Sequence, residues 1–325
     1  MRTISTILSL LLMATSISAN THGKKHEPKG KAIVQIFTNF HSGFGAANDD
    51  RGFELERSYL GYEYSFNRNI SVKAIMDIGQ SSDVDDYQRI AYIKNALVNW
   101  RVSGFTFNGG LIPTTQFGYQ ENFWGYRYIY RTFQDRYAFG SSADLGLSAS
   151  YMFADWIAAD VIVANGEGYR QVQVNDGLLY GIGTTITPFK GMSFRFYAGL
   201  NEGTEGAKDI VNYSMFAGYR CSFLSAGIEY NIMRNNRRVE GKNLYGFSMY
   251  ASGRINSWLD IYARTDGLMS SDDWNEDNDE IAILAGVQFK LGRYIKIAPN
   301  FRITMPSADG ESNRYYAYLS CCFGL

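Results

Sequence analysis

Long apolar runs are missing from the sequence. No stretch approaches the roughly twenty apolar residues that a membrane-spanning helix needs, which excludes transmembrane helices. Proline and cysteine are also scarce, at 5 and 3 residues, whereas Tyr, Phe and Gly number 24, 21 and 33. Few prolines and many aromatic residues are typical of a strand-rich protein. Cys321 and Cys322 are adjacent and would face opposite sides of a strand, so a disulfide framework is not expected.

An excess of charge of either sign is missing too. The formal net charge is −1, without the basic excess by which proteins bind nucleic acid, so nucleic acid is excluded as a partner. No glycine-rich phosphate-binding loop opens a helix, and the acidic segment 271–280 lacks the spacing of a calcium loop. The sequence therefore predicts no cofactor and no metal site. Any selectivity for charged solutes must come from local clusters.

The first nineteen residues have the layout of a secretory signal peptide. Arg2 precedes an apolar stretch over residues 4–13 and a small-residue stretch over 14–19, and we expect cleavage after Ala19. Residues 20–30 are polar and basic with no apolar period, which predicts a flexible periplasmic segment. The rest of the chain, residues 31–325, is expected to form a single folded unit.

Connections of two unequal kinds alternate along this unit. Very short connections are expected at residues 66–69, 103–104, 154–155, 190–191, 221–222, 256–257 and 291–293. Longer polar connections are expected at residues 43–52, 80–87, 114–138, 165–176, 202–208, 233–242, 269–279 and 306–313. Short turns at one rim and long loops at the other are typical of outer-membrane barrels. The segments between them predict an all-β, transmembrane antiparallel β-barrel of about sixteen strands.

Apolar and polar side chains alternate within single segments. In the segment 192–201, Phe194 and Phe196 would face lipid, while Arg195 and Tyr197 would face inward. A soluble β-sandwich also alternates, but its inner face would be the apolar one, and a chain of this length would more often divide into domains. Sixteen strands leave a lumen wide enough for water.

The same alternation assigns charged residues to the lumen. The expected lumen cations are Arg57, Lys73, Lys94, Arg195, Arg220, Arg254, Arg264, Lys290, Lys296 and Arg302. The expected lumen acids are Glu63, Asp77, Asp144, Asp160, Glu229, Asp260 and Asp266. Some of these residues will pair across strands and stiffen the wall. The modest cationic excess favours anions, because charge is poorly screened in a narrow passage.

The longest loop, residues 114–138, is the third long loop and is rich in aromatic residues. Read at helical spacing, one stripe consists of Phe123, Tyr126, Tyr130, Phe133 and Tyr137, and the next of Trp124, Arg127, Arg131 and Gln134. We expect this loop to fold into the barrel with its aromatic stripe on the wall. Arg127, Arg131 and Arg136 would then form the pore constriction. An extracellular lid or a subunit contact is the alternative for this loop.

Several short segments of the sequence suggest a known family. They are Gly-Gly-Leu-Ile-Pro at 109–113, Phe-Glu-Leu-Glu-Arg-Ser-Tyr-Leu-Gly-Tyr at 53–62, the aromatic loop through Asp135-Arg136, and Ala-Asp-Leu-Gly at 143–146. Together these segments, mainly in the N-terminal half, resemble the phosphate-selective porins of the O and P type. The resemblance implies a sixteen-stranded trimer with an inward-folded third loop, an arginine ladder and a lysine cluster for anions. The sequence departs from that pattern in having no lysine between Thr114 and Ala138.

These patterns predict a porin in the Gram-negative outer membrane. Small hydrophilic solutes would diffuse through it, with a preference for anions. Phosphate would be one of these anions. We expect a homotrimer in contact with outer-membrane lipid and lipopolysaccharide. One alternative is a non-conducting barrel that serves as a structural protein or an adhesin.

The other alternative is an outer-membrane hydrolase. Beyond the N-terminal segment only His41 could act as a base, and it lies next to Ser42 and near Asp49 and Asp50. Neighbouring residues of a strand face opposite sides, so Ser42 cannot easily serve His41. No catalytic site is therefore expected.

Overall fold

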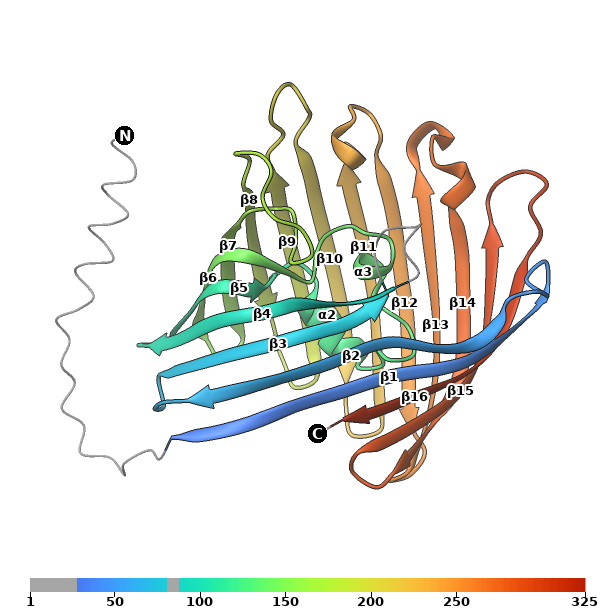
Figure 1. Ribbon diagram of the computed structural model, residues 1–325, viewed down its shortest axis with the longest axis horizontal. Helices are drawn as coiled ribbons and strands as arrows, with labels where there is room; N and C mark the ends of the chain where they lie inside the picture. Colours follow the sequence, from blue (N-terminus) through green and yellow to red (C-terminus); the bar gives the residue numbers. More distant parts are fainter. Residues whose placement is uncertain (1–27, 81–87, 325) are drawn as a thin grey trace.

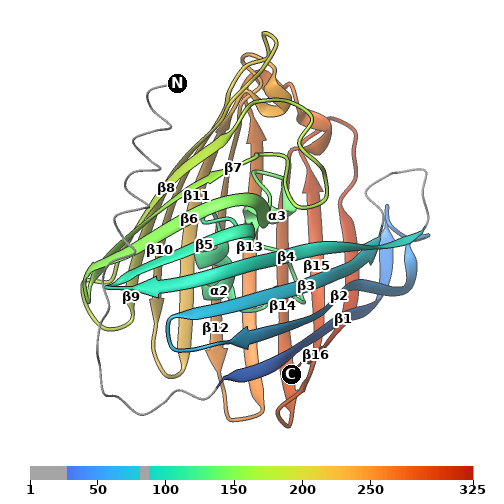
Figure 2. The ribbon, with the colours of Figure 1, turned by 60° about the vertical axis from the view of Figure 1, so that its left-hand side comes forward.

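The computed structural model describes residues 28–80 and 88–324, and over these ranges sixteen strands form one closed barrel (Figure 1, Figure 2). Every strand pairs antiparallel with its neighbours in sequence, and β1 closes the ring by pairing with β16. The predicted all-β transmembrane barrel of sixteen strands is confirmed. Within the described ranges no helix is long and apolar enough to cross a membrane.

The strands are β1 (Lys29–Gly45), β2 (Arg51–Ser65), β3 (Ile70–Gln80), β4 (Arg89–Val102), β5 (Phe105–Pro113), β6 (Ala143–Ala154), β7 (Ile157–Ala164), β8 (Leu179–Ile186), β9 (Met192–Asn201), β10 (Ile210–Arg220), β11 (Leu224–Arg234), β12 (Leu244–Arg254), β13 (Leu259–Ser270), β14 (Glu280–Leu291), β15 (Ile295–Pro306) and β16 (Arg314–Gly324). The third loop carries α2 (Gly118–Trp124) and α3 (Phe133–Arg136). Three short 3₁₀ turns lie in later loops: η2 (Asn236–Arg238), η3 (Ser271–Asp273) and η4 (Glu276–Asn278).

The strand boundaries differ from the predicted ones most clearly around the first and third long loops. Strand β1 begins at Lys29, so its first residues come from the segment predicted to be flexible, and β1 and β2 leave only residues 46–50 for the first long loop. The expected signal peptide lies outside the described residues, as do residues 20–27 and most of the second long loop. The third loop is longer than predicted and runs from residue 114 to residue 142.

The short connections are closed by residues suited to tight turns. Ser103 and Gly104 join β4 to β5 with φ angles of 48° and 85°, as a two-residue hairpin requires. Asn67 and Asn256 perform the same task in two other turns, each accepting two backbone N–H groups through its side-chain oxygen at 2.8–3.0 Å. These turns all lie at the same rim, since consecutive strands are antiparallel.

Side chains alternate between the outer surface and the lumen. On β13, Asp260, Arg264 and Asp266 face inward and are buried, while Ile261 faces outward and is exposed. The outer surface carries many such exposed large apolar residues, far beyond the apolar patches of soluble monomers. This arrangement reverses that of a soluble protein and suits a surface that faces lipid.

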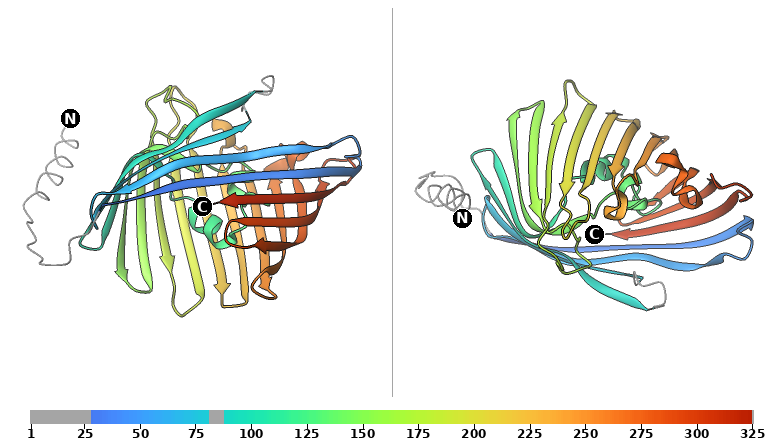
Figure 3. Two further views of the ribbon diagram at one scale, coloured as in Figure 1. Left: turned by 60° about the horizontal axis from the view of Figure 1, so that its bottom comes forward. Right: turned by 90° about the horizontal axis from the view of Figure 1, so that it is seen from above.

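The largest apolar cluster lies inside the ring of strands, around the third loop. Figure 3 shows both helices of this loop within the barrel. The predicted inward fold of the loop is therefore confirmed. The single helical stripe expected over residues 123–137 is wrong in detail, because α2 ends at Gly125 in a left-handed conformation (φ 73°) and the chain turns before α3 begins. Both helices are short, so packing against the wall fixes them rather than helix propensity.

Candidate functional site

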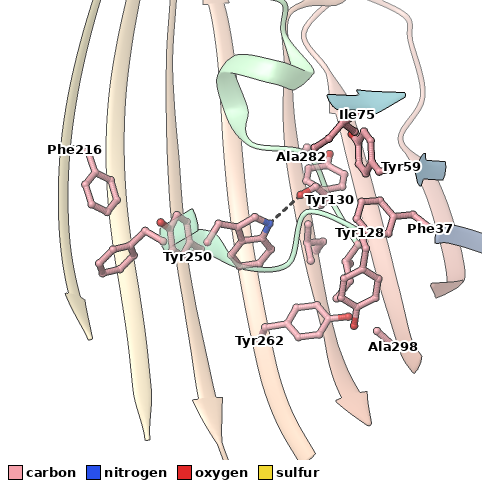
Figure 4. Packing of buried hydrophobic residues seen from close by; sticks show 14 residues of the cluster. Phe37, Tyr59, Ile75, Tyr128, Tyr130, Phe216, Tyr250, Tyr262, Ala282 and Ala298 are labelled. Atoms are coloured by element: carbon pink, nitrogen blue, oxygen red, sulfur yellow. Dashed lines mark hydrogen bonds between the residues drawn. The ribbon is translucent and has the colours of Figure 1, made fainter. Parts of the chain in front are cut away.

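One end of the third loop packs on β10, β12 and β13. The ring of Phe123 meets Phe216 edge-on at a centroid distance of 5.0 Å, and the indole of Trp124 lies 5.0 Å from the ring of Tyr250. Trp124 is buried, with an exposed fraction of 1%, and its Nε1 donates a hydrogen bond to the Tyr130 carbonyl at 2.9 Å. These contacts, drawn in Figure 4, hold the first half of the loop against one side of the wall.

The tip of the loop reaches the opposite side of the barrel. The hydroxyl of Tyr128 donates to Gln288 of β14 at 2.7 Å, and its ring lies 6.2 Å from that of Phe37 on β1. Arg302 of β15 donates to the backbone carbonyl of Ile129 at 2.7 Å. Figure 4 shows the resulting row of aromatic residues from Phe216 to Phe37. The loop therefore extends through the lumen from β10 to β1.

Wall glycines make room for the loop. A side chain at Gly218 would overlap the ring of Phe123, and one at Gly246 would overlap the ring of Phe133. Phe133 has an exposed fraction of 0%. The absence of a β-carbon at these two positions lets the loop aromatics approach the backbone of β10 and β12.

We expect Gly246→Ala to push α3 off the wall. The new methyl group would lie within 3 Å of both Phe133 and the carbonyl of Gly267, so overpacking should cost about 1–3 kcal/mol and loosen the loop. Limited proteolysis of the folded barrel should cut the loop faster. Gly253→Ala on the same strand is the matched control, because its methyl group would meet nothing closer than 3.5 Å. Equal cleavage of the two variants would contradict this account of the glycine.

The three arginines predicted at the constriction have different surroundings. Arg127 is balanced by two carboxylates, Glu121 at 2.7 Å and Asp135 at 3.1 Å, all within the loop. Arg136 pairs with Glu280 of β14 at 2.8 Å. Arg131 is exposed to the lumen and forms no ion pair with any described residue. The first two therefore hold the loop in place, and Arg131 keeps its charge available.

Tyr130 lies at the centre of several cations. The guanidinium carbons of Arg136, Arg264 and Arg302 lie 4.6, 5.4 and 5.2 Å from its ring centroid. Burial raises the pKa of Tyr130 to about 12, although Arg136 acts in the opposite direction. The phenol is therefore neutral at neutral pH, and its ring stabilises cations through its π face.

Half of the predicted lumen cations are ion-paired. The pairs are Arg57 with Asp77 at 3.5 Å, Arg195 with Asp160 at 2.8 Å, Arg254 with Asp260 at 4.0 Å and Arg264 with Asp266 at 2.8 Å. Lys290, also placed in the lumen by the sequence, pairs with Asp260 at 2.6 Å. Within residues 28–80 and 88–324, no ion pair involves Lys73, Lys94, Arg220, Lys296 or Arg302. Pairing in the wall thus removes much of the charge that the sequence pattern counts.

Loop residues 165–178 contribute a second inward contact that the sequence did not reveal. Tyr169 donates its hydroxyl proton to Asp77 of β3 at 2.5 Å, and Lys94 lies between the rings of Tyr169 and Tyr59 at 5.8 and 4.7 Å. Arg170 stacks on Tyr92 of β4 at 5.3 Å. Burial and the nearby Asp77 raise the pKa of Tyr169. The loop therefore adds a cation and two ring contacts to the lumen beside β3 and β4.

A β-bulge in β2 orients two acidic side chains toward the lumen that the sequence did not predict there. The pairing of β1 with β2 shifts between Phe37 and Thr38, which leaves Glu56 as an extra residue. Asn39 then donates to Glu54 at 3.2 Å and to Glu56 at 2.9 Å, so both carboxylates face inward. In a regular strand they would share the face opposite to Arg57. Sequence periodicity gives no sign of such a shift.

His41 and Ser42, the residues considered for hydrolysis, do not face one another. His41 bonds Asn39 and Asp50, each at 3.0 Å, while Ser42 lies on the opposite face of β1. Over the described ranges, no three His, Cys, Asp or Glu side chains are grouped so that they could hold a metal ion. In the acidic loop, Asp279 accepts from the Ser270 backbone N–H at 2.7 Å, so that carboxylate closes the loop.

No protein-family model and no curated protein matches the sequence. Solved structures share the fold. The outer-membrane-expressed OmpT of Vibrio cholerae superposes with a TM-score of 0.62 at 13% identity, over 93% of this chain and 99% of that one. An anion-selective porin from Comamonas acidovorans superposes with a TM-score of 0.68 at 11% identity, over 92% of this chain and 100% of that one. OprB of Pseudomonas putida superposes with a TM-score of 0.69 at 10% identity, over 91% of this chain and 94% of that one. At such identities the likeness concerns the fold.

Proposed function

We propose that the protein is an outer-membrane porin for the passive diffusion of small hydrophilic solutes, with a preference for anions. The observation that carries this proposal is the third loop, which crosses a sixteen-stranded barrel and holds Arg131 exposed in the lumen. A fixed loop inside a wide barrel narrows the path and brings fixed charges close to a passing solute. The barrels with a similar fold include one described as an anion-selective porin.

The charges around Arg131 support the anion preference. Arg57 of β2 is among the cations that act on Arg131, while Lys94 of β4 and Arg170 of loop 165–178 add positive charge beside Tyr59 and Tyr92. Glu54 and Glu56 of β2 contribute negative charge that partly offsets these cations. Since Arg127 and Arg136 are already balanced by carboxylates, Arg131 is the constriction residue whose change should act most directly on selectivity. Phosphate is among the anions to be tested, as the resemblance to O and P type porins implies.

The proposal includes export through a signal peptide over residues 1–19, with a mature barrel in contact with outer-membrane lipid and lipopolysaccharide. We also propose a homotrimer and no catalytic role. The apolar outer surface supports the membrane location. The pairing of His41 with Asp50 and Asn39, with Ser42 on the other face, supports the absence of hydrolytic chemistry.

Arg131→Glu tests the selectivity. In a planar bilayer under a potassium chloride gradient, the zero-current potential of the wild type should indicate chloride preference, and the variant should shift it toward potassium. Reversing a unit charge beside the path changes the energy of a passing ion by about 1–2 kcal/mol, which is roughly a five- to thirtyfold change in the permeability of that ion. Lys242→Glu, in the long loop between β11 and β12, carries the same charge change outside the constriction and should shift the potential little.

Two results would contradict the proposal in different ways. A wild type that conducts with no preference for chloride would reject anion selectivity and leave the pore. A folded barrel without conductance in either chloride or phosphate would reject the pore. It would favour a plugged structural or adhesive barrel, for which the contacts of the third loop with both β10 and β1 are the specific observation.

A further inference from the structure

A polar cavity lies behind the third loop, at the rim of the short turns. Its volume is about 280 Å³, and the turn after β10 forms part of its wall. Trp124 and the end of α2 form its ceiling, while Arg220, Arg254 and Lys296 project into it from β10, β12 and β15. This volume is just below the roughly 300–1,000 Å³ of sites for drug-sized ligands, so the cavity suits a smaller molecule.

The cavity has a strong excess of positive charge. Asp260 is the acid in its lining, and it is already engaged by Lys290 at 2.6 Å and by Gln288 at 2.7 Å. Arg254 stands 4.0 Å from the same carboxylate and keeps 59% of its side chain exposed. Arg220 donates to the carbonyls of Phe123 and Asn122, which are uncharged. Three cations, Arg220, Arg254 and Lys296, therefore line the cavity against one carboxylate, which Lys290 already neutralises from outside the lining.

The position of the lysines makes this excess costly to the fold. Lys290 and Lys296 are direct partners across β14 and β15, on the inner face. Like charges opposite one another on a sheet destabilise it. Within the described residues no second acid relieves the repulsion. An anion bound in the cavity would relieve it.

The spacing of the strands that carry these cations suggests the kind of anion. Arg254 and Lys296 come from strands three spacings apart, about 14 Å along the wall, and both side chains reach into the same cavity. A monoanion can meet one end of this arrangement. A molecule with a carboxylate at each end can meet both, with its carbon chain along Phe123 and Trp124.

We propose that this cavity binds small dicarboxylates on their way through the barrel. Arg220 and Arg254 would hold one carboxylate and Lys296 the other, while Ser225 and Ser252 border the carbon chain. The inference deepens the proposed function, and rests on it, in naming a solute class and a second binding position beyond the constriction. The binding itself is measurable without conductance.

Calorimetric titration of the refolded barrel in detergent micelles tests the inference. Succinate, propionate and inorganic phosphate are titrated separately at equal, low ionic strength. Succinate should bind at one site, at least tenfold more tightly than propionate or phosphate, and added salt should weaken it. The double variant Arg254→Gln with Lys296→Gln should bind succinate at least tenfold more weakly. Arg293→Gln, which removes a cation from the turn between β14 and β15, should bind like the wild type.

The outcomes separate the two proposals. If the barrel conducts but does not bind succinate, or binds it no more tightly than propionate, the proposed dicarboxylate site is rejected and the porin proposal stands. Equal or tighter binding of phosphate would overturn the assignment to dicarboxylates. Succinate binding that depends on Arg254 and Lys296 in a barrel without conductance would support the cavity and overturn the pore. Because the ligand comparison uses the wild type, it decides the question even where the double variant fails to fold.

Discussion

Replacing Trp124 and Phe133 together by alanine should release the third loop from the wall and raise the single-channel conductance severalfold. The two side chains anchor the two helices of the loop, with exposed fractions of 1% and 0%. Truncating a buried aromatic residue typically costs about 3–5 kcal/mol. The loop has ends fixed at β5 and β6 but no strand partner of its own, so it can open locally while the barrel stays closed.

The same double variant should change ion selectivity as well as conductance. Tyr130 accepts the indole N–H of Trp124 through its carbonyl, so loss of the indole also frees the segment that carries Arg131. Ions would then pass a wider lumen in which water screens the wall charges. Conductance and zero-current potential, recorded on the same channels, should move together.

The control removes the same residue types from outside the lumen. Trp156 and Phe189 lie at short turns with exposed fractions of 53% and 62%, and their replacement by alanine should leave conductance unchanged. Unaltered conductance in the Trp124 and Phe133 variant, with folding verified by heat-dependent gel mobility, would show that the loop does not limit the pore.

The barrel itself could be predicted from the sequence because its physical signals are local. Strict alternation of long loops and tight turns gives the strand number, and period two gives the facing of residues such as Phe196 and Arg195. Both signals depend on each segment meeting lipid on one side and water on the other. The solvent imposes this condition on every strand separately, so no knowledge of distant contacts is needed.

The site could be predicted only in part because it depends on distant contacts. Arg127 and Arg131 are four residues apart in one loop, yet the first is balanced by Glu121 and Asp135 and the second is not. The inward turn of Glu56 depends on a bulge between β1 and β2 that periodicity cannot show. The docking of Tyr169 on β3 likewise joins segments far apart in sequence. Such pairings follow from register and loop packing.

The charge pair beneath the loop should have the largest effect on stability. Arg264 bonds Asp266 through two nitrogens at 2.8 Å each, and both side chains are nearly or fully buried at 1% and 0% exposure. Glu229 of β11 is a second buried acid in the same layer, with an exposed fraction of 2%. Arg264→Leu would leave two buried carboxylates with no cation of the wall between them. Breaking a buried pair from one side typically costs about 3–5 kcal/mol.

A double-mutant cycle separates the pair from its burial. The cycle comprises Arg264→Leu, Asp266→Leu and the two together. The double variant removes both charges, and apolar replacement of a whole buried pair is often neutral or stabilising. We therefore expect the double variant to recover most of the stability that Arg264→Leu loses, as measured by urea unfolding of the barrel in lipid vesicles. It should not recover the wild-type selectivity, because Trp124 and Tyr130 lie 5.2 and 5.4 Å from the Arg264 guanidinium and would lose that cation. If Arg264→Leu were as stable as the wild type, water would have to reach Asp266 and Glu229, and the loop would not exclude solvent from them.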